Sequence, residues 1–178
     1  GKHPNLSIEI YSESTHQIVR KLNDFSLDAG ILYFDNGDPE TTVKLYEERY
    51  VFIAPKSLTV SKEKQITWTE VAQIPLCLLT QNMKNRQLLD RHFLDLGISP
   101  SIVTEASDFT AVLAQVAAGN AATIAPVSVA QTFLDLKSTK QLDLIRPVLT
   151  HSVGLSIKDQ SPVLPMIEAL RKAVKSAL

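Results

Sequence analysis

The chain has 178 residues, of which 44% are hydrophobic and 21% are charged, and its formal net charge is −1. A chain of this length buries roughly 70% of its unfolded surface, which suits one domain or two small ones. The composition argues against a disordered tail, a membrane span and a self-sufficient nucleic-acid-binding domain, because it lacks strong net charge, long apolar runs and a basic cluster.

Local patterns predict the first elements. Residues 6–11 alternate apolar and polar side chains, which predicts a strand. Thr15 is expected to cap the helix that follows. The apolar face of this helix holds Ile18, Val19, Leu22 and Phe25. Two further strands are predicted at 28–34 and 49–54, and residues 35–39 between them form a turn.

A capping box predicts the next helix. The Thr67 hydroxyl can accept a hydrogen bond from one backbone amide of the first turn, while the Glu70 carboxylate accepts one from the cap amide. Ile66 and Val71 stand at the two positions of a hydrophobic staple, and Pro75 ends the helix.

Strands and helices continue in alternation along the rest of the chain. The predicted strands are 76–80, 102–105, 121–125, 143–149 and 152–158. The predicted helices are 85–96 with Gly97 as its stop, a helix capped by Asp108 and ended by Gly119, 127–136, and a last helix with Ser161 as cap and Pro162 as first residue. Their inward residues are Leu88, Leu89, Phe93, Leu96, Val112, Leu113, Val116, Val163, Met166, Ile167, Leu170 and Val174. This alternation predicts an α/β fold with mainly parallel sheets flanked by helices.

The reactive residue types show no pattern of a catalytic or metal site. Cys77 is the only cysteine and lies in an apolar run, so we expect a buried hydrophobe and neither a disulfide nor a cysteine-based metal site. The four histidines have no metal-ligand spacing and are expected at the surface or as caps; they are His3, His16, His92 and His151. We therefore expect no enzyme, no metal and no cofactor.

Several segments together resemble the effector-binding domain of LysR-type transcriptional regulators. The segments that carry this resemblance are 3–6, 27–31, 50–55, 66–76 and, most specifically, 113–119 followed by 121–126, a helix–glycine–strand–proline pattern. They cover nearly the whole chain in the family's order.

The resemblance implies two subdomains of the type-2 periplasmic-binding-protein kind, joined by two crossing strands. Subdomain I is expected at 1–48 plus 148–178, and subdomain II at 49–147. The family's preceding strand and helix and its DNA-binding helix-turn-helix are absent from this sequence, so Gly1 is interpreted as a cloning remnant and any effector site as partial. The missing strand belongs between 6–11 and 28–34, so subdomain I is expected to be the weaker half. The sheet of subdomain I is then expected to close directly without that strand, to exchange a strand with a neighbouring molecule, or to associate with one through the open position.

The implied function is effector sensing by a bacterial, cytoplasmic transcription factor, in which ligand-dependent closure of two lobes biases a dimer or tetramer. DNA would be contacted only by the absent domain, so we expect this chain to have no DNA affinity of its own and no contact with a membrane. The alternative is an extracytoplasmic solute-binding protein of a transporter, although no secretory signal opens the chain. An enzyme on the same fold is a third interpretation.

The resemblance also implies an effector site in the cleft between the subdomains, at turns that lead from strands into helices. The residues implied as effector contacts are Thr15, Tyr33, Thr80, Gln81, Asn82, Ser107 and Phe109. Thr15 is equally well explained as an N-cap, and Tyr33 and Phe109 by packing, whereas Thr80 and Gln81 have no equally good structural explanation. Asp108 at one helix N-terminus predicts a small, partly polar ligand that is not strongly anionic at that end.

Overall fold

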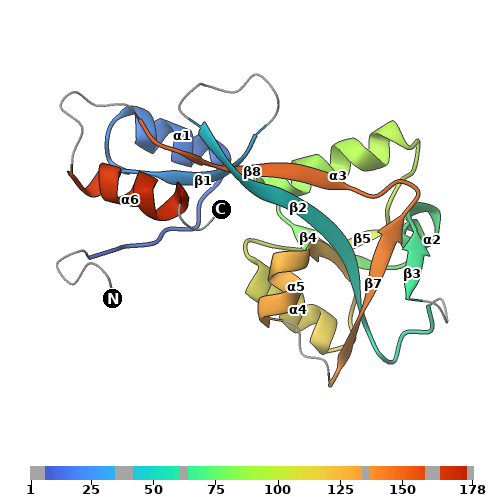
Figure 1. Cartoon of the computed structure of the whole chain (residues 1–178). Helices are drawn as coiled ribbons and strands as arrows, with labels where there is room; N and C mark the ends of the chain where they lie inside the picture. Colours follow the sequence, from blue (N-terminus) through green and yellow to red (C-terminus); the bar gives the residue numbers. More distant parts are fainter. Residues whose placement is uncertain (1–6, 35–41, 61–63, 134–136, 159–164, 176–178) are drawn as a thin grey trace. The chain divides into compact units, whose positions relative to one another are not determined.

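The computed structural model describes residues 7–34, 42–60, 64–133, 137–158 and 165–175 (Figure 1). Its helices are α1 (Thr15–Asn23), α2 (Trp68–Ala72), α3 (Lys84–Asp95), α4 (Phe109–Ala117), α5 (Val127–Phe133) and α6 (Pro165–Lys175). Its strands are β1 (Gly30–Phe34), β2 (Thr42–Pro55), β3 (Gln65–Thr67), β4 (Leu76–Leu79), β5 (Ile102–Ala106), β6 (Thr123–Pro126), β7 (Thr139–Ile145) and β8 (Thr150–Ser156). None of the helices in these ranges is long and apolar enough to cross a membrane.

The chain divides into two compact units. Unit 1 comprises Gly1–Tyr46 and Ser152–Leu178, and unit 2 comprises Glu47–His151. The chain crosses from one unit to the other within β2 and again within β8. The boundaries expected from the sequence, 1–48 plus 148–178 and 49–147, lie a few residues from these crossings.

Unit 2 holds most of the buried apolar side chains. The C-terminal part of β2, from Tyr50 to Pro55, pairs antiparallel with β6 on one side and with β7 on the other. β7 in turn pairs parallel with β3. Alternate residues of β2 face opposite sides: Phe52 packs with the α2 and α3 side chains, whereas Ile53 packs with those of α4. β4 and β5 form a separate parallel pair. This unit therefore has a core on both faces of its sheet.

Unit 1 has a smaller core. β1 pairs antiparallel with β8 from Gly30 opposite Ser156 to Phe34 opposite Ser152. α1 covers one face, and a Cβ added to Gly30 would lie 2.6 Å from Ile18 Cγ2, so this glycine permits the close approach of helix and strand. α6 covers the other face, where Ile167 packs on Leu155.

The predicted strand at 6–11 is wrong for the residues that the structure describes. Ser7–Tyr11 has no regular secondary structure, and Leu6 lies outside the described residues. Ile8 is 71% exposed and Ile10 is 90% exposed. The alternating pattern is compatible with a strand, but a strand forms only where another strand completes its ladder. No ladder to this segment is present among the described strands.

The start and end of α1 also differ from the prediction. The N-cap is Ser14, whose hydroxyl accepts from the Gln17 amide while the Gln17 side chain accepts from the Ser14 amide. Thr15 is therefore the first helical residue and not the cap. Phe25 lies beyond the helix with φ 61° and is 54% exposed, so it does not join the inward face. The Ser26 and Phe25 amides bond back to Lys21 and Leu22, which forms a Schellman ending.

The α/β fold class is confirmed, but the sheets are mixed where the sequence predicted mainly parallel ones. β7 and β8 follow each other with no helix between them, and β2 is one long strand that begins at Thr42 and not at Arg49. Without crossover helices, neighbouring strands can pair antiparallel. The last two strands lie earlier than predicted, at 139–145 and 150–156. The predicted turn at 35–39, the helix end at 134–136, Ser161, Pro162 and Val163 lie outside the described residues.

Most other local predictions are confirmed. Thr67 caps α2 and forms the complete capping box with Glu70, and Ile66 and Val71 are both buried in the same cluster. The Glu70 carboxylate accepts hydrogen bonds from Thr67, which lower its pKa. Gly97 and Gly119 follow α3 and α4 with φ of 67° and 86°. These signals are confirmed because they depend on a few adjacent residues.

Candidate functional site

Two turns of unit 2 lie side by side at the carboxyl ends of β4 and β5. These strands are parallel neighbours, with Leu79 opposite Ala106, so their following turns meet at one edge. The Thr80 amide donates to the Ala106 carbonyl at 3.0 Å and extends the pairing by one residue. The structure thus brings together Thr80, Gln81, Asn82, Ser107 and Phe109, five of the residues that the resemblance implied.

The turn after β4 is held by donors at the start of α3. Arg86 Nη1 donates to the Leu79 carbonyl at 2.8 Å, and the Met83 amide donates to the Thr80 carbonyl at 3.0 Å. The Gln87 side chain donates to the Gln81 carbonyl at 3.1 Å. Three consecutive carbonyls are thereby occupied, which fixes the path of the turn.

Arg86 is the buried centre of this arrangement. Its side chain is 4% exposed, yet it carries a full charge next to the backbone of β4. Its guanidinium pairs with Asp90 at 2.7 Å and with Glu105 on β5. Burial by itself lowers the pKa of Arg86, but the hydrogen bonds with Asp90 and Glu105 outweigh it and raise the pKa above its ordinary value. One charged group therefore ties α3 to the ends of both strands.

The two helix N-termini at this edge differ in charge. Asp108 caps α4, where its carboxylate accepts from the Ala111 amide at 2.9 Å. The N-cap of α3, Met83, makes no side-chain hydrogen bond, and its first turn contains no acidic residue. The partial positive charge of the α3 terminus is therefore not neutralised by a cap, whereas that of α4 faces a carboxylate.

The other predicted contacts divide between packing and exposed positions. Phe109 is half-buried and packs against two apolar clusters, one with Leu113 and one with Cys77, as its structural interpretation predicted. Ser107, Gln81 and Asn82 are exposed, and Thr80 is half-buried.

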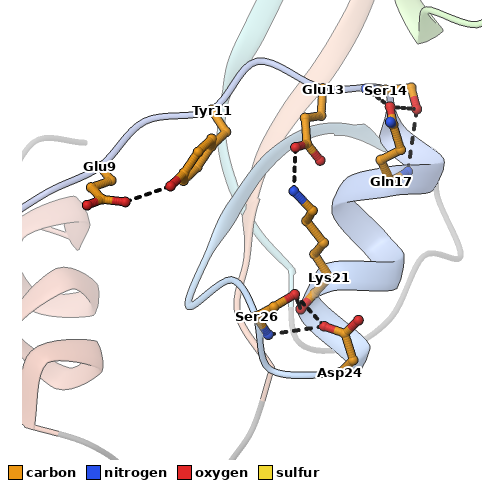
Figure 2. Close-up of polar contacts among 8 residues, drawn as sticks. All are labelled: Glu9, Tyr11, Glu13, Ser14, Gln17, Lys21, Asp24 and Ser26. Carbon is orange, nitrogen blue, oxygen red and sulfur yellow. Dashed lines mark hydrogen bonds and ion pairs between the residues drawn. The ribbon is translucent and has the colours of Figure 1, made fainter.

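Thr15 and Tyr33 belong to unit 1. Thr15 is the first residue of α1, and Tyr33 is a half-buried residue of β1 opposite Val153. Figure 2 shows the polar contacts around this helix, in which Lys21 pairs with Glu13 and Tyr11 donates to Glu9 at 2.6 Å. Contact of Thr15 and Tyr33 with an effector stays a prediction.

The sequence interpretation missed a group of buried polar side chains next to this turn. Asn85, in the first turn of α3, donates to the Tyr50 hydroxyl at 3.1 Å, and both residues are buried. Arg86 was missed in the same way. The spacing of Arg86 and Asp90 is a readable signal of an ion pair on one helix, but no sequence pattern indicates that it is buried.

Two histidines also depart from the expected surface position. His92 packs on Trp68 with ring centroids 4.3 Å apart, and burial lowers its pKa. His151 contacts Tyr50 edge to face at 5.9 Å. His16 is exposed, as predicted, and His3 lies outside the described residues.

Cys77 is fully buried, as predicted, and burial raises the pKa of its thiol. Within the described ranges, no group of three or more histidine, cysteine, aspartate and glutamate side chains is placed to hold a metal ion.

Comparison with known proteins identifies the family. The model of the LysR substrate binding domain matches residues 1–178. Among solved structures, the chain is similar to the regulatory domain of CcmR from Synechocystis PCC6803 in complex with 2-PG, with a TM-score of 0.85 and 11% identity over 98% of this chain and 85% of that one. It is also similar to the effector-binding domain of QuiR in complex with shikimate, with a TM-score of 0.79 and 19% identity over 97% and 82%.

A longer relative is full-length CbnR in complex with its target DNA. The TM-score is 0.74 with 20% identity, over 93% of this chain and 58% of CbnR. At these identities the structural matches establish the fold, and the family match over every residue establishes the relationship. The chain belongs to the LysR substrate-binding-domain family.

Proposed function

We propose that this chain is the effector-sensing domain of a LysR-type transcriptional regulator, and that unit 2 contacts the effector at the paired turns after β4 and β5. The observation that carries the proposal is the fixed turn at Thr80, where Arg86 and Gln87 hold the backbone carbonyls and leave the side chains of Gln81 and Asn82 exposed. A binding site needs such rigid support for its contacting groups. Membership of this family favours a regulatory domain over the solute-binding protein of a transporter.

The electrostatics of the two turns favour a ligand whose two ends differ in charge. An anionic or strongly accepting group suits the uncapped α3 terminus near Asn82, because backbone amides and the helix dipole favour negative charge there. A neutral or donor group suits the α4 terminus, because the Asp108 carboxylate repels a second anion. A small monoanion that carries hydroxyl or amino groups fits both ends, and a dianion does not.

In this proposal the seven predicted contacts divide by unit. Thr80, Gln81, Asn82 and Ser107 supply hydrogen bonds, and Phe109 supplies an apolar wall. Thr15 and Tyr33 are the contacts proposed for unit 1.

The proposed output is regulatory and not catalytic. An effector shifts the equilibrium between two states of the regulator only by its difference in affinity for them. The parent protein then acts in the cytoplasm as a dimer or tetramer and contacts DNA through a separate domain, while this chain by itself binds no DNA.

A ligand screen followed by matched variants tests the proposal. The panel contains shikimate, small monocarboxylates, dicarboxylates, amino acids and neutral polyols, each tested by thermal shift. A ligand at about 100 times its Kd stabilises the protein by about 2.7 kcal/mol, which such an assay detects readily. We expect a hydroxylated or amino-substituted monocarboxylate to give the largest shift.

Asn82→Ala is the informative variant, and Asn120→Ala is its control, because both asparagines are exposed in unit 2 and Asn120 lies at the far end of α4. We expect Asn82→Ala to lower the affinity for the best ligand of the screen by tenfold or more, and Asn120→Ala to lower it by less than twofold. Equal affinities of the two variants would place the site elsewhere. A dianion that binds best and gains affinity in Asp108→Asn would confirm this edge as the site but contradict the proposed ligand chemistry.

A further inference from the structure

Two histidines that the proposed effector site does not use border the core of unit 2. His92, in the last turn of α3, packs on the Trp68 ring of α2 with centroids 4.3 Å apart. His151, in β8, contacts the Tyr50 ring of β2 edge to face at 5.9 Å. Trp68 and Tyr50 are buried in one apolar cluster, so both imidazoles border the same core. The two imidazoles are also close enough to repel each other when charged.

The surroundings of His92 suit a neutral imidazole. Its Nε2 atom is buried and has no hydrogen-bond partner in the part of the chain that the structure describes. A protonated imidazole has an N–H donor at both nitrogens, so its Nε2–H would be buried without an acceptor. A charged donor without a partner inside a protein costs far more than a neutral one. Uptake of a proton by His92 therefore opposes its packing on Trp68.

The groups that face the two histidines do not offset this cost. On α3, Asp95 favours the charged form of His92, but its side chain is 60% exposed to water. β8 contributes His151, which repels a charged His92, and α2 contributes the uncharged Trp68 ring. β2 presents the Tyr50 phenol to His151, and a phenol is uncharged where histidines titrate. Burial is the largest effect, and together with His151 it lowers the pKa of His92.

A chain of contacts joins the two histidines to the first turn of α3. The Tyr50 hydroxyl, on the ring that His151 contacts, accepts a hydrogen bond from Asn85 Nδ2 at 3.1 Å. Asn85 lies seven residues before His92, about two helical turns away on the same face of α3. The turn that carries Asn82 leads directly into this first turn. The last turn of α3 is thus connected through two side chains to the turn of the candidate site.

We propose that His92 and His151 form a proton-sensing pair in unit 2, and that uptake of a proton displaces His92 from Trp68. The displacement passes through Tyr50 and Asn85 to the first turn of α3. The element with two states is the packing of α3 on these rings, which is intact when the pair is neutral and loosened when it is charged. The structural change does not need a ligand, whereas its regulation of effector affinity rests on the proposed function. By linkage, an effector that prefers the neutral pair lowers the pair's affinity for the proton by the same factor.

Trp68 fluorescence of the whole chain, titrated between pH 8 and pH 5, tests the pair, because Trp68 is the only tryptophan and contacts His92. We expect a transition with a midpoint below 6.5, the ordinary pKa of histidine, while circular dichroism shows that the chain stays folded. His92→Gln is expected to abolish the transition. His151→Gln is expected to move its midpoint to higher pH, because the repelling charge is lost while burial remains. His16→Gln is the control and is expected to leave it unchanged, because His16 is exposed in unit 1.

Backbone amide NMR signals report whether the change reaches the candidate site. In the wild type, the amides of Asn82 and Asn85 are expected to shift with the same midpoint as the Trp68 emission. The Asn120 amide, at the far end of α4, is the internal control and is expected not to follow this midpoint. Tyr50→Phe removes the hydroxyl that Asn85 bonds but keeps the ring. It is expected to keep the Trp68 transition and to lose the shift at Asn82.

The two parts of the proposal fail in different ways. A wild-type chain without a Trp68 transition would overturn the pair, and so would a midpoint that His151→Gln does not move. A Trp68 transition without a shift at Asn82 would overturn the transmission along α3, and a shift that persists in Tyr50→Phe would overturn its route. These measurements use no ligand, so a failed effector screen contradicts the proposed function and leaves the proton-sensing pair standing.

Discussion

Replacing Arg86 by methionine tests whether one buried charge supports the candidate site. Methionine keeps most of the apolar stem but removes the guanidinium that bonds the Leu79 carbonyl at 2.8 Å and pairs with Asp90 and Glu105. Arg91→Met is the control on the same helix, because Arg91 pairs with Asp95 at 3.1 Å but is 76% exposed.

The expected loss of unfolding free energy comes mainly from the Leu79 carbonyl, which loses its donor. A hydrogen bond from a charged donor to a buried acceptor contributes about 1.5–3 kcal/mol. Removing one partner of a fully buried ion pair costs about 3–5 kcal/mol, but Asp90 and Glu105 are 41% and 39% exposed and regain water, so their share falls to that of a surface pair, below about 1 kcal/mol. Arg86→Met is therefore expected to destabilise unit 2 by about 2–3 kcal/mol, and Arg91→Met by less than about 0.5 kcal/mol.

Urea unfolding followed by tryptophan fluorescence measures this difference directly. Trp68 is the only tryptophan, is 1% exposed and lies in unit 2, so its emission reports the unit in question. The free energy of unfolding of Arg86→Lys is expected to lie between those of the wild type and Arg86→Met, since a lysine keeps the charge but cannot contact all three acceptors at once. If Arg86→Met loses no more unfolding free energy than Arg91→Met, the buried charge does not support the turn and the reasoning is refuted.

Three further changes probe other parts of the fold. Burial lowers the pKa of His92, so the unfolded state binds more protons than the folded state when the pH falls through the ordinary histidine range, and stability decreases as the pH is lowered. The urea midpoint of His92→Gln is therefore expected to change less between pH 7 and pH 5 than that of the wild type. Thr67→Ala removes the α2 cap and is expected to cost about 0.5–2 kcal/mol in urea unfolding, more than the exposed Thr69→Ala in the same helix. A Cβ at residue 154 would lie 2.6 Å from Thr42 Cγ2 and 2.7 Å from Phe34 Cε1, so Gly154→Ala is expected to cost about 1–3 kcal/mol, measured by calorimetry, and an unchanged Tm would contradict that overlap.

The sequence by itself determined the features that depend on neighbouring residues. The capping box at Thr67, the cap at Asp108 and the glycine endings at Gly97 and Gly119 are all present. Each is a set of hydrogen bonds closed within one helical turn, so the residues that form it are adjacent in the chain. Most of the order of strands and helices was predictable from such local patterns, and the family resemblance added the division into two subdomains, but neither indicated β3 or the mixed pairing of the sheets.

Tertiary structure decided every feature that needs a distant partner. Ser7–Tyr11 has the alternation of a strand but no ladder in the described structure, and the ladders within the sheets are mixed. Arg86, Asn85 and His92 are polar residues on an amphipathic helix, yet they are buried or half-buried because Glu105, Tyr50 and Trp68 approach from other elements. A polar group becomes stable inside a protein only when its partner is in place, and partners from separate strands and helices meet only after the chain has folded.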